Sequence, residues 1–206
     1  MALTSFFRDR ETLDLIGEHL APRMRSQQGV RIWDAGCASG EEPYTLAILF
    51  AEWMDPGAFG TLRIDATDHE ESDFPQFARS IAEGVFSTTD TMWVPRPFFE
   101  KYFEATDAPD RHRLVAALRE RIVFHKNDLR ALSPVDSCYD LVVCKNVLLH
   151  VPDAERGGVA MMFARSLLLG GYAAFEATQP MPEDAAPYFE KIGERGGLFR
   201  KVTELP

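Results

Sequence analysis

Residues 31–44 of the chain read RIWDAGCASGEEPY, a short apolar run that ends in Asp34 and leads into a loop with two glycines. The apolar run is typical of a buried β-strand, and Pro43 can stand in the first turn of a following helix. A strand, a glycine loop and a helix in this order form the ligand-binding corner of doubly wound α/β folds. The stretch therefore predicts both the fold and the place where its ligand binds.

The loop differs from the two common phosphate-binding patterns. It has neither the Lys and Ser/Thr of a nucleoside triphosphatase loop nor the G-x-G-x-x-G spacing of dinucleotide folds. Glu41 and Glu42 stand at the predicted N-terminus of the helix, where they would oppose a phosphate group. A cationic ligand without phosphate suits this position better. S-adenosylmethionine, which carries a sulfonium and an ammonium group, has these properties.

The remainder of the chain continues the alternation of strands and helices. We expect an amphipathic helix at residues 4–22, with Thr4 or Ser5 as its cap. Gly170 and Gly171 would end the last helix. Strands are expected at 30–34, 62–66, 121–124, 139–144 and 172–176, helices at 43–54, 74–82 and 154–169, and a final sheet segment at 197–205. This pattern predicts an open, doubly wound, mostly parallel α/β sheet with helices on both faces.

The composition favours a single globular domain over residues 1–206, with a small inserted subdomain at about 85–120. Hydrophobic residues make up 46% of the chain and charged residues 26%, which is ordinary for a soluble protein. Neither a membrane span nor a signal peptide is expected, and the three cysteines lack metal-ligand spacing, which favours a cytoplasmic protein without a metal site. The formal charge of −10 disfavours nucleic acids and anionic membranes as partners.

Polar residues follow three further predicted strands, at the same edge of the sheet as the glycine loop. Asp68 could accept hydrogen bonds from two ribose hydroxyls, Asp128 could accept one from an adenine amine, and Asn146 would line the pocket opposite the loop. A turn or a helix cap is the usual role of such a residue when it stands alone. Together with the loop they mark four successive strand ends, a pattern that favours a nucleoside-type ligand.

Several segments, in this order, resemble the CheR-type S-adenosylmethionine-dependent methyltransferases: LTSFFRD, RIWDAGCASGEEPYTLA, ATDHE, FHKNDL and CKNVLLHV. Members of that family methylate glutamate side chains of bacterial chemoreceptors. The resemblance runs from about residue 3 to about residue 180, and GEEPY is its most specific element. It implies the class I methyltransferase fold, which is Rossmann-like, and S-adenosylmethionine as the cofactor.

The resemblance also implies roles for individual residues. Arg8 would lie near the transferred methyl group, and Glu42 near the methionine end of the cofactor. Arg8 and His150 are the predicted catalytic residues, and His150 stands where the family has a tyrosine near the methyl-transfer site. The predicted cofactor-binding residues are Thr4, Arg8, Asp34, Gly36, Gly40, Glu42, Asp68, Asp128, Leu129 and Asn146.

Other positions depart from the family pattern. Lys145 replaces an arginine, Asp128 replaces the asparagine of many relatives, and residues 177–179 replace a His-Ser-Glu segment. We expect the N-terminal helical domain of the family, whose basic helix is thought to dock on the receptor, to be absent.

The predicted function is methyl transfer to a carboxylate, as in protein glutamate O-methylation. The predicted partner is an acidic helical protein such as a chemoreceptor or a related signalling protein. Two alternatives remain open: a methyltransferase for another protein or a small-molecule acceptor, and a non-catalytic regulatory module that binds S-adenosylmethionine.

Overall fold

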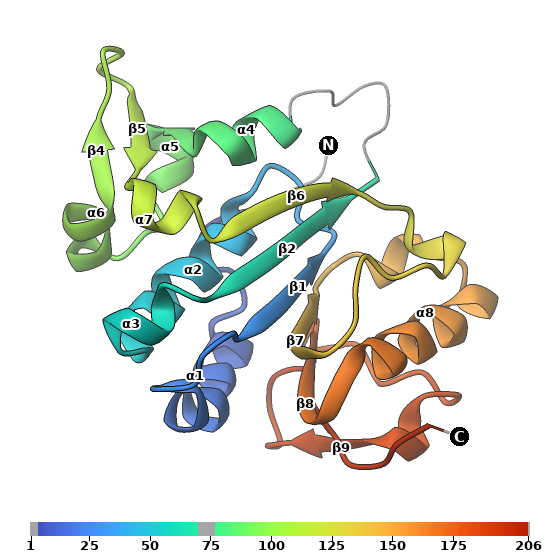
Figure 1. Ribbon diagram of the computed structural model, residues 1–206. Helices are drawn as coiled ribbons and strands as arrows, with labels where there is room; N and C mark the ends of the chain where they lie inside the picture. Colours follow the sequence, from blue (N-terminus) through green and yellow to red (C-terminus); the bar gives the residue numbers. More distant parts are fainter. Residues whose placement is uncertain (1–3, 70–76, 206) are drawn as a thin grey trace.

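Figure 1 shows the computed structural model, which describes residues 4–69 and 77–205. The strands of its large sheet are β1 Arg31–Ala35, β2 Arg63–Asp68, β6 Ile122–Lys126, β7 Tyr139–Cys144, β8 Leu167–Phe175, β9 Phe189–Ile192 and β10 Leu198–Lys201. Within the described residues these seven strands lie in the order β6-β2-β1-β7-β8-β10-β9. Pairing is parallel from β6 to β8, and β10 is antiparallel to both of its neighbours. The doubly wound, mostly parallel sheet that the sequence predicts is confirmed.

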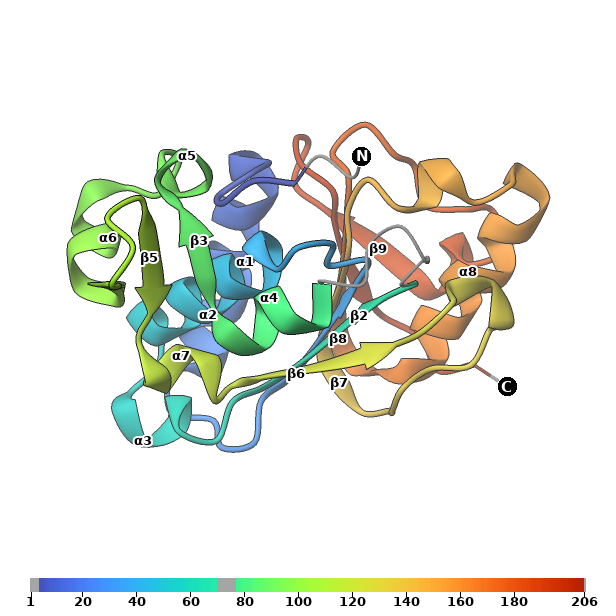
Figure 2. The same cartoon turned by 90° about the horizontal axis from the view of Figure 1, so that it is seen from above.

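Helices cover both faces of this sheet. The larger ones are α1 Arg10–Met24, α2 Glu41–Trp53, α4 Phe77–Glu83 and α8 Asp153–Ser166, and a short α3 spans Pro56–Phe59. Seen from above, α1 and α2 lie on one side of the sheet and α8 on the other (Figure 2). Both faces of the sheet are therefore screened from water, as a parallel sheet requires.

Alternate residues of β1 supply the two halves of the core, because successive side chains of a strand point to opposite faces. Ile32 belongs to the cluster that includes Leu20 of α1 and Leu46 of α2. Trp33 belongs to the opposite cluster, and its ring centroid lies 5.2 Å from that of Phe163 in α8. The five side chains named here, from the two clusters, are all fully buried. Burial of residues of this size stabilises the fold by about 1.5–3 kcal/mol each.

A second, smaller sheet lies beside α2 and α4, in the region where the sequence predicts an inserted subdomain (Figure 1). Its elements are β3 Val85–Ser87, α5 Thr88–Thr91, α6 Arg96–Tyr102, β4 Phe103–Ala105, β5 Arg111–Leu114 and α7 Ala116–Arg119. The central strand β5 is antiparallel to β3 and β4. The ring of Phe6 packs edge-on against Phe86 at 5.0 Å and Phe103 at 5.8 Å. The small sheet therefore anchors the N-terminal segment.

The predicted start of the first helix is wrong. α1 begins at Arg10, and its cap is Asp9, whose side chain accepts a hydrogen bond from Thr12 N, not Thr4 or Ser5. Phe7 and Asp9 both have φ near 56°, a left-handed conformation that interrupts a helix. Residues 4–9 consequently run as a separate segment between the small sheet and the large one.

The helix predicted at 154–169 is too long, and the strand after it is too short. α8 ends at Ser166, and β8 follows directly at Leu167, so Gly170 and Gly171 lie inside the strand. The pairing of β7 with β8 is irregular next to Tyr139, and a Cβ on Gly171 would lie 3.1 Å from the Tyr139 carbonyl oxygen. These glycines thus permit a bulge and are not a helix stop.

Two further points concern strand β9 and the helix predicted at 74–82. Strand β9 was not predicted from the sequence, whereas the segment at 197–205 does contain a strand, β10. Of the helix predicted at 74–82, the described part is α4, and residues 74–76 lie outside the described residues.

Candidate active site

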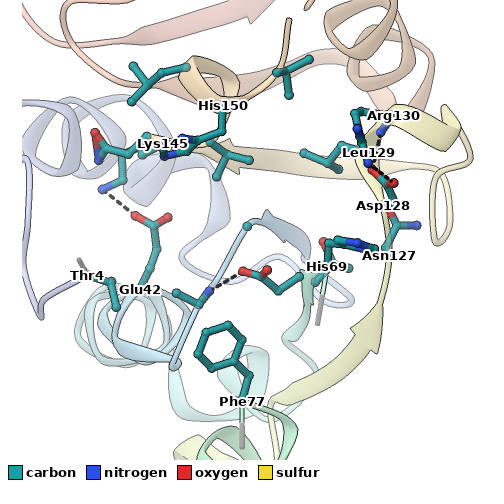
Figure 3. Close-up of a pocket in the computed structure, with 18 of the residues that line it drawn as sticks. Thr4, Glu42, His69, Phe77, Asn127, Asp128, Leu129, Arg130, Lys145 and His150 are labelled. Atoms are coloured by element: carbon teal, nitrogen blue, oxygen red, sulfur yellow. Dashed lines mark hydrogen bonds and ion pairs between the residues drawn. The ribbon is translucent and has the colours of Figure 1, made fainter. Parts of the chain in front are cut away.

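A cavity of about 640 Å³ lies at the carboxyl ends of β1, β2, β6 and β7 (Figure 3). The strand order reverses between β1 and β7, so the cavity is at the switch point where doubly wound folds bind ligands. Its volume falls within the range of about 300–1,000 Å³ that is usual for cofactor pockets. The predicted site residues that line it are Thr4, Arg8, Gly36, Glu42, Asp68, Asp128, Leu129, Asn146 and His150.

Two predicted residues, Asp34 and Gly40, are not among the residues that line the cavity. Asp34 is fully buried beneath the loop. Gly40 is the N-cap of α2 with φ 106°, and a Cβ there would lie 2.8 Å from Ile81 Cγ1. Gly40 therefore shapes the turn into the helix, and a direct contact of either residue with a ligand stays a prediction.

The glycine loop packs at Gly36 against Val147, in the segment that follows β7. The amide groups of Gly36 and Cys37 both donate to the Thr67 carbonyl oxygen, at 2.7 and 3.0 Å, which ties the loop to β2. Gly36 has φ 104°, and a Cβ on it would lie 2.1 Å from Val147 Cγ2. Only glycine fits here, for both conformational and steric reasons.

The substitution Gly36→Ala should therefore destabilise the protein by at least about 2 kcal/mol, because a strained backbone and overpacking each cost about 1–3 kcal/mol. Urea unfolding measures the free energy of unfolding. Gly57→Ala in α3 is the matched control, since a Cβ on Gly57 meets nothing within 4 Å. Equal stability of the two variants would contradict the loop geometry.

Asp68 at the end of β2 is held by the same loop. Its Oδ2 accepts a hydrogen bond of 2.7 Å from the Ala38 amide. Burial raises the pKa of Asp68 above its ordinary value, although hydrogen bonds from the Ala38 and His69 backbones act against this shift. The loop thus fixes one oxygen of a carboxylate that lines the cavity.

Only one of the two loop glutamates lines the cavity. Glu41 is 5% exposed and accepts a 2.6 Å hydrogen bond from Ser39 Oγ, and burial raises its pKa. Glu42 forms an ion pair of 2.8 Å between its Oε1 and Lys145 Nζ (Figure 3). Both glutamates do stand in the first turn of α2, as the sequence predicts, but Glu41 is buried and Lys145 balances the charge of Glu42.

Lys145 is the main residue of the site that the sequence does not assign to it, since the sequence marks Lys145 only as a departure from the family pattern. Its side chain is 3% exposed, and Nζ also donates to the Arg8 carbonyl oxygen at 3.1 Å. Burial alone would lower the pKa of Lys145, but Glu42, Asp9 and Asp34 more than offset this, and the pKa is raised. A lysine that directly follows the buried, apolar end of a strand, residues 141–144, is the signal that points to a buried partner.

Asp34 lies beside this ion pair, and within the described residues no donor satisfies either of its carboxyl oxygens. Burial, followed by the charge of Glu42, raises the pKa of Asp34 well above its usual range, and Lys145 only partly opposes this. Asp34 interacts with Glu42, a second carboxyl group, and two carboxyl groups can form a hydrogen bond only when one of them holds a proton. The environment therefore favours the protonated form of Asp34.

The raised pKa of Asp34 has a consequence for stability. The folded state binds a proton that the unfolded chain releases, so the free energy of unfolding falls as pH rises from about 4, the ordinary aspartate value, through the raised pKa. Asp34→Asn should abolish this loss, and the variant should be more stable than the wild type by about 1–3 kcal/mol at neutral pH.

Thermal unfolding between pH 4 and pH 8 tests this prediction, with Asp14→Asn on the exposed side of α1 as the control. The difference between Asp34→Asn and the wild type should grow with pH. A variant that is less stable than the wild type at pH 8 would show that the Asp34 carboxylate is ionised and stabilises the folded state.

The opposite end of the cavity is formed by Asp128 and its neighbours (Figure 3). Arg130 donates to the Asp128 carboxylate from Nε at 3.2 Å and from Nη2 at 3.1 Å. The guanidinium of Arg130 lowers the pKa of Asp128. Asp128 also caps the short 3-10 turn Leu129–Ala131 through the Arg130 amide. An adenine amine would have to share this carboxylate with Arg130, which the sequence did not reveal. Leu129, which is 7% exposed, adds an apolar wall.

Asn146 and His150 lie on the loop after β7. Asn146 has φ 60°, a left-handed conformation that asparagine tolerates better than most residues. It does not cap a helix, because α8 begins only at Asp153 with Pro152 as its N-cap. His150 ends the 3-10 turn Leu148–His150, and both residues line the cavity.

The N-terminal segment completes the wall with Thr4 and Arg8. It is held where Phe7 N donates to Thr45 Oγ1 at 3.1 Å, and where the Phe7 ring stacks on Phe98 at 5.6 Å. Residues far apart in the sequence thus meet at one cavity.

Neither a metal site nor a membrane-spanning helix is found in the part of the chain that the structure describes. In residues 4–69 and 77–205 there is no group of three or more His, Cys, Asp or Glu side chains with a metal-binding arrangement. No helix in those ranges combines the length and the apolar character needed to cross a bilayer.

Comparison with known proteins gives a consistent result. The chain is 34% identical over 176 residues to a 104.1 kDa protein of Rhodobacter capsulatus, covering 82% of this chain and 18% of that one. It is 27% identical over 177 residues to a chemotaxis protein methyltransferase of Borreliella burgdorferi, covering 82% of this chain and 61% of the relative. The chain thus spans less than two thirds of the length of these relatives.

Among solved structures, an rRNA methyltransferase of Streptomyces viridochromogenes has a similar fold. The TM-score is 0.56 at 17% identity, with 98% of this chain and 87% of the other covered. A family model described as "CheR methyltransferase, SAM binding domain" matches residues 2–195. The cofactor that fits the cavity is therefore S-adenosylmethionine, and the chain belongs to the CheR methyltransferase family, whose SAM-binding domain it contains.

Proposed function

We propose that this protein transfers the methyl group of S-adenosylmethionine to a carboxylate, on a glutamate side chain of a protein. The observation that carries the proposal is that Arg8 and His150 line the same cavity as Glu42, Asp68 and Asp128. When bound, S-adenosylmethionine supplies a methyl group activated by a sulfonium. The family to which the chain belongs supports this reading.

The polar residues suit the parts of this cofactor in order along the cavity. Asp68 would accept hydrogen bonds from the ribose, since the loop already holds one of its oxygens. Glu42 would face the methionine ammonium, and its ion pair with Lys145 fixes its direction. Leu129 and Asp128 would border the adenine. Gly36 lets the loop backbone approach without a side chain.

The acceptor needs little activation, because a carboxylate is already anionic at neutral pH. Positioning can then supply most of the catalysis, an effect worth about 7–11 kcal/mol in favourable intramolecular cases. Arg8 would steer the acceptor carboxylate through its fork of donors, and His150 would donate a hydrogen bond beside the reacting groups. The absence of a strong general base from this scheme is consistent with an O-methyltransferase.

The partner proposed is an acidic helical signalling protein such as a chemoreceptor, encountered in the cytoplasm. Relatives of the chain are named chemotaxis protein methyltransferases, but the identities of 24–29% leave the acceptor itself as a proposal.

The test is release of S-adenosylhomocysteine from S-adenosylmethionine, with and without a purified cytoplasmic fragment of a chemoreceptor as acceptor. We expect release that depends on the fragment and falls at least about tenfold in Arg8→Ala, since Arg8 would orient the acceptor. Tight binding of S-adenosylhomocysteine without any turnover would support a regulatory binding module. Turnover with small-molecule acceptors alone would support a different methyltransferase.

A further inference from the structure

The loop that carries His150 is held from outside the cavity by one side chain of α8. Arg156 donates from Nε to the Val151 carbonyl oxygen at 2.9 Å and from Nη2 to the Leu149 carbonyl oxygen at 3.3 Å. These two carbonyl groups flank His150 in the chain. The third nitrogen, Nη1, lies 2.7 Å from Asp153 Oδ1, so each guanidinium nitrogen has a partner.

The loop has weak backbone support of its own between two buried anchors. Leu148 and Val151 are 0% and 6% exposed, but Leu149 between them is 53% exposed. The intervening backbone forms a single 3-10 turn, closed by hydrogen bonds from His150 N to Val147 O and from Val151 N to Leu148 O. Such short turns are poorly bonded, so the guanidinium adds constraints that the turn lacks.

We propose that Arg156 is a positioning residue for the methyl-transfer site. Its planar fork fixes the carbonyl groups on both sides of His150 and thereby sets the direction in which the imidazole enters the cavity. Arg156 is not among the residues that line the cavity, so it acts through His150. The proposal rests on the proposed function for the role of His150, whereas the restraint of the loop is independent of it.

The experiment compares Arg156→Gln, Arg156→Lys and the control Arg165→Gln, which removes an exposed arginine from the same helix. Hydrogen exchange of residues 147–151 reports the restraint of the loop, and calorimetry reports the affinity for S-adenosylhomocysteine. Turnover is measured with the cytoplasmic chemoreceptor fragment as acceptor. A Lys can reach only one of the two carbonyl groups, so its variant should lie between the wild type and Arg156→Gln.

We expect Arg156→Gln to accelerate exchange in this loop and to lower kcat at least about tenfold, with the affinity for S-adenosylhomocysteine within about twofold of the wild type. Arg165→Gln should match the wild type in all three measurements. In a His150→Phe background, Arg156→Gln should lower kcat little further, because coupled residues are not additive. A merely structural role would give the same loss in both backgrounds.

Unchanged exchange of the loop in Arg156→Gln would overturn the proposal whether or not the protein is active. An unchanged kcat, or an additive loss in the His150→Phe background, would overturn it for an active enzyme. If the wild type forms no S-adenosylhomocysteine with the fragment, the proposed function fails. Faster exchange that is confined to Arg156→Gln and Arg156→Lys would then still support the restraint.

Discussion

Replacing Lys145 by Met should destabilise the protein by about 3–5 kcal/mol, because loss of one partner leaves a buried charge without compensation. The ion pair joins side chains that are 3% and 14% exposed, and Lys145 also holds the N-terminal segment through the Arg8 carbonyl oxygen. Urea unfolding monitored by circular dichroism measures the loss. Met fills a similar volume, so the effect reports charge more than packing.

A double-mutant cycle makes this prediction specific. Glu42→Gln in the Lys145→Met background removes the unpaired charge, and it should restore part of the stability that the single substitution loses. Lys145→Arg keeps the charge and should be milder than Lys145→Met. A Lys145→Met protein as stable as the wild type would mean that the pair is solvated and does not organise this end of the cavity.

Replacing Asp68 by Ala should weaken binding of S-adenosylhomocysteine about 10- to 150-fold. The basis is that hydrogen bonds to a charged group contribute about 1.5–3 kcal/mol. The Ala38 amide also loses its acceptor in this variant, so part of the effect can come from the glycine loop. Isothermal titration calorimetry measures the affinity.

Asp68→Asn separates the two contributions, since its amide oxygen can still accept from Ala38 N while the negative charge is gone. We expect its affinity to lie between those of the wild type and Asp68→Ala, with both variants folded by circular dichroism. Wild-type affinity in a folded Asp68→Ala protein would contradict the placement of the ribose at the end of β2.

The sequence was most informative where a local pattern has one physical solution. The nearly all apolar segment at 139–144 is typical of a central strand, and residues 139–144 form β7, each of them buried. The glycine loop was correctly located because a positive φ and close contact with Val147 require a residue without a side chain. Strand ends in a parallel sheet meet at one edge, and Asp68, Asp128 and Asn146 line one cavity there, while their contacts with a cofactor stay a prediction.

Features that depend on contacts between distant segments could not be predicted. Asp9 caps α1 because the segment before it is held by Phe6 against the small sheet, a contact that no local pattern encodes. Gly170 and Gly171 have the appearance of a helix stop until β7 and β8 are known to pair there. Glu41 and Glu42 are neighbours in sequence, yet one is buried against Ser39 and the other pairs with a lysine about a hundred residues away.

The chemistry of the methylated product decides whether a carboxylate receives the methyl group. The protein is incubated with S-adenosylmethionine labelled in its methyl group and a cytoplasmic chemoreceptor fragment, and the labelled fragment is then treated with alkali. A glutamate methyl ester is cleaved by alkali, so we expect the label to leave the fragment as volatile methanol. Label that stays on the fragment after this treatment would indicate methylation of nitrogen, sulfur or an ether oxygen, and would show that the acceptor is not a carboxylate.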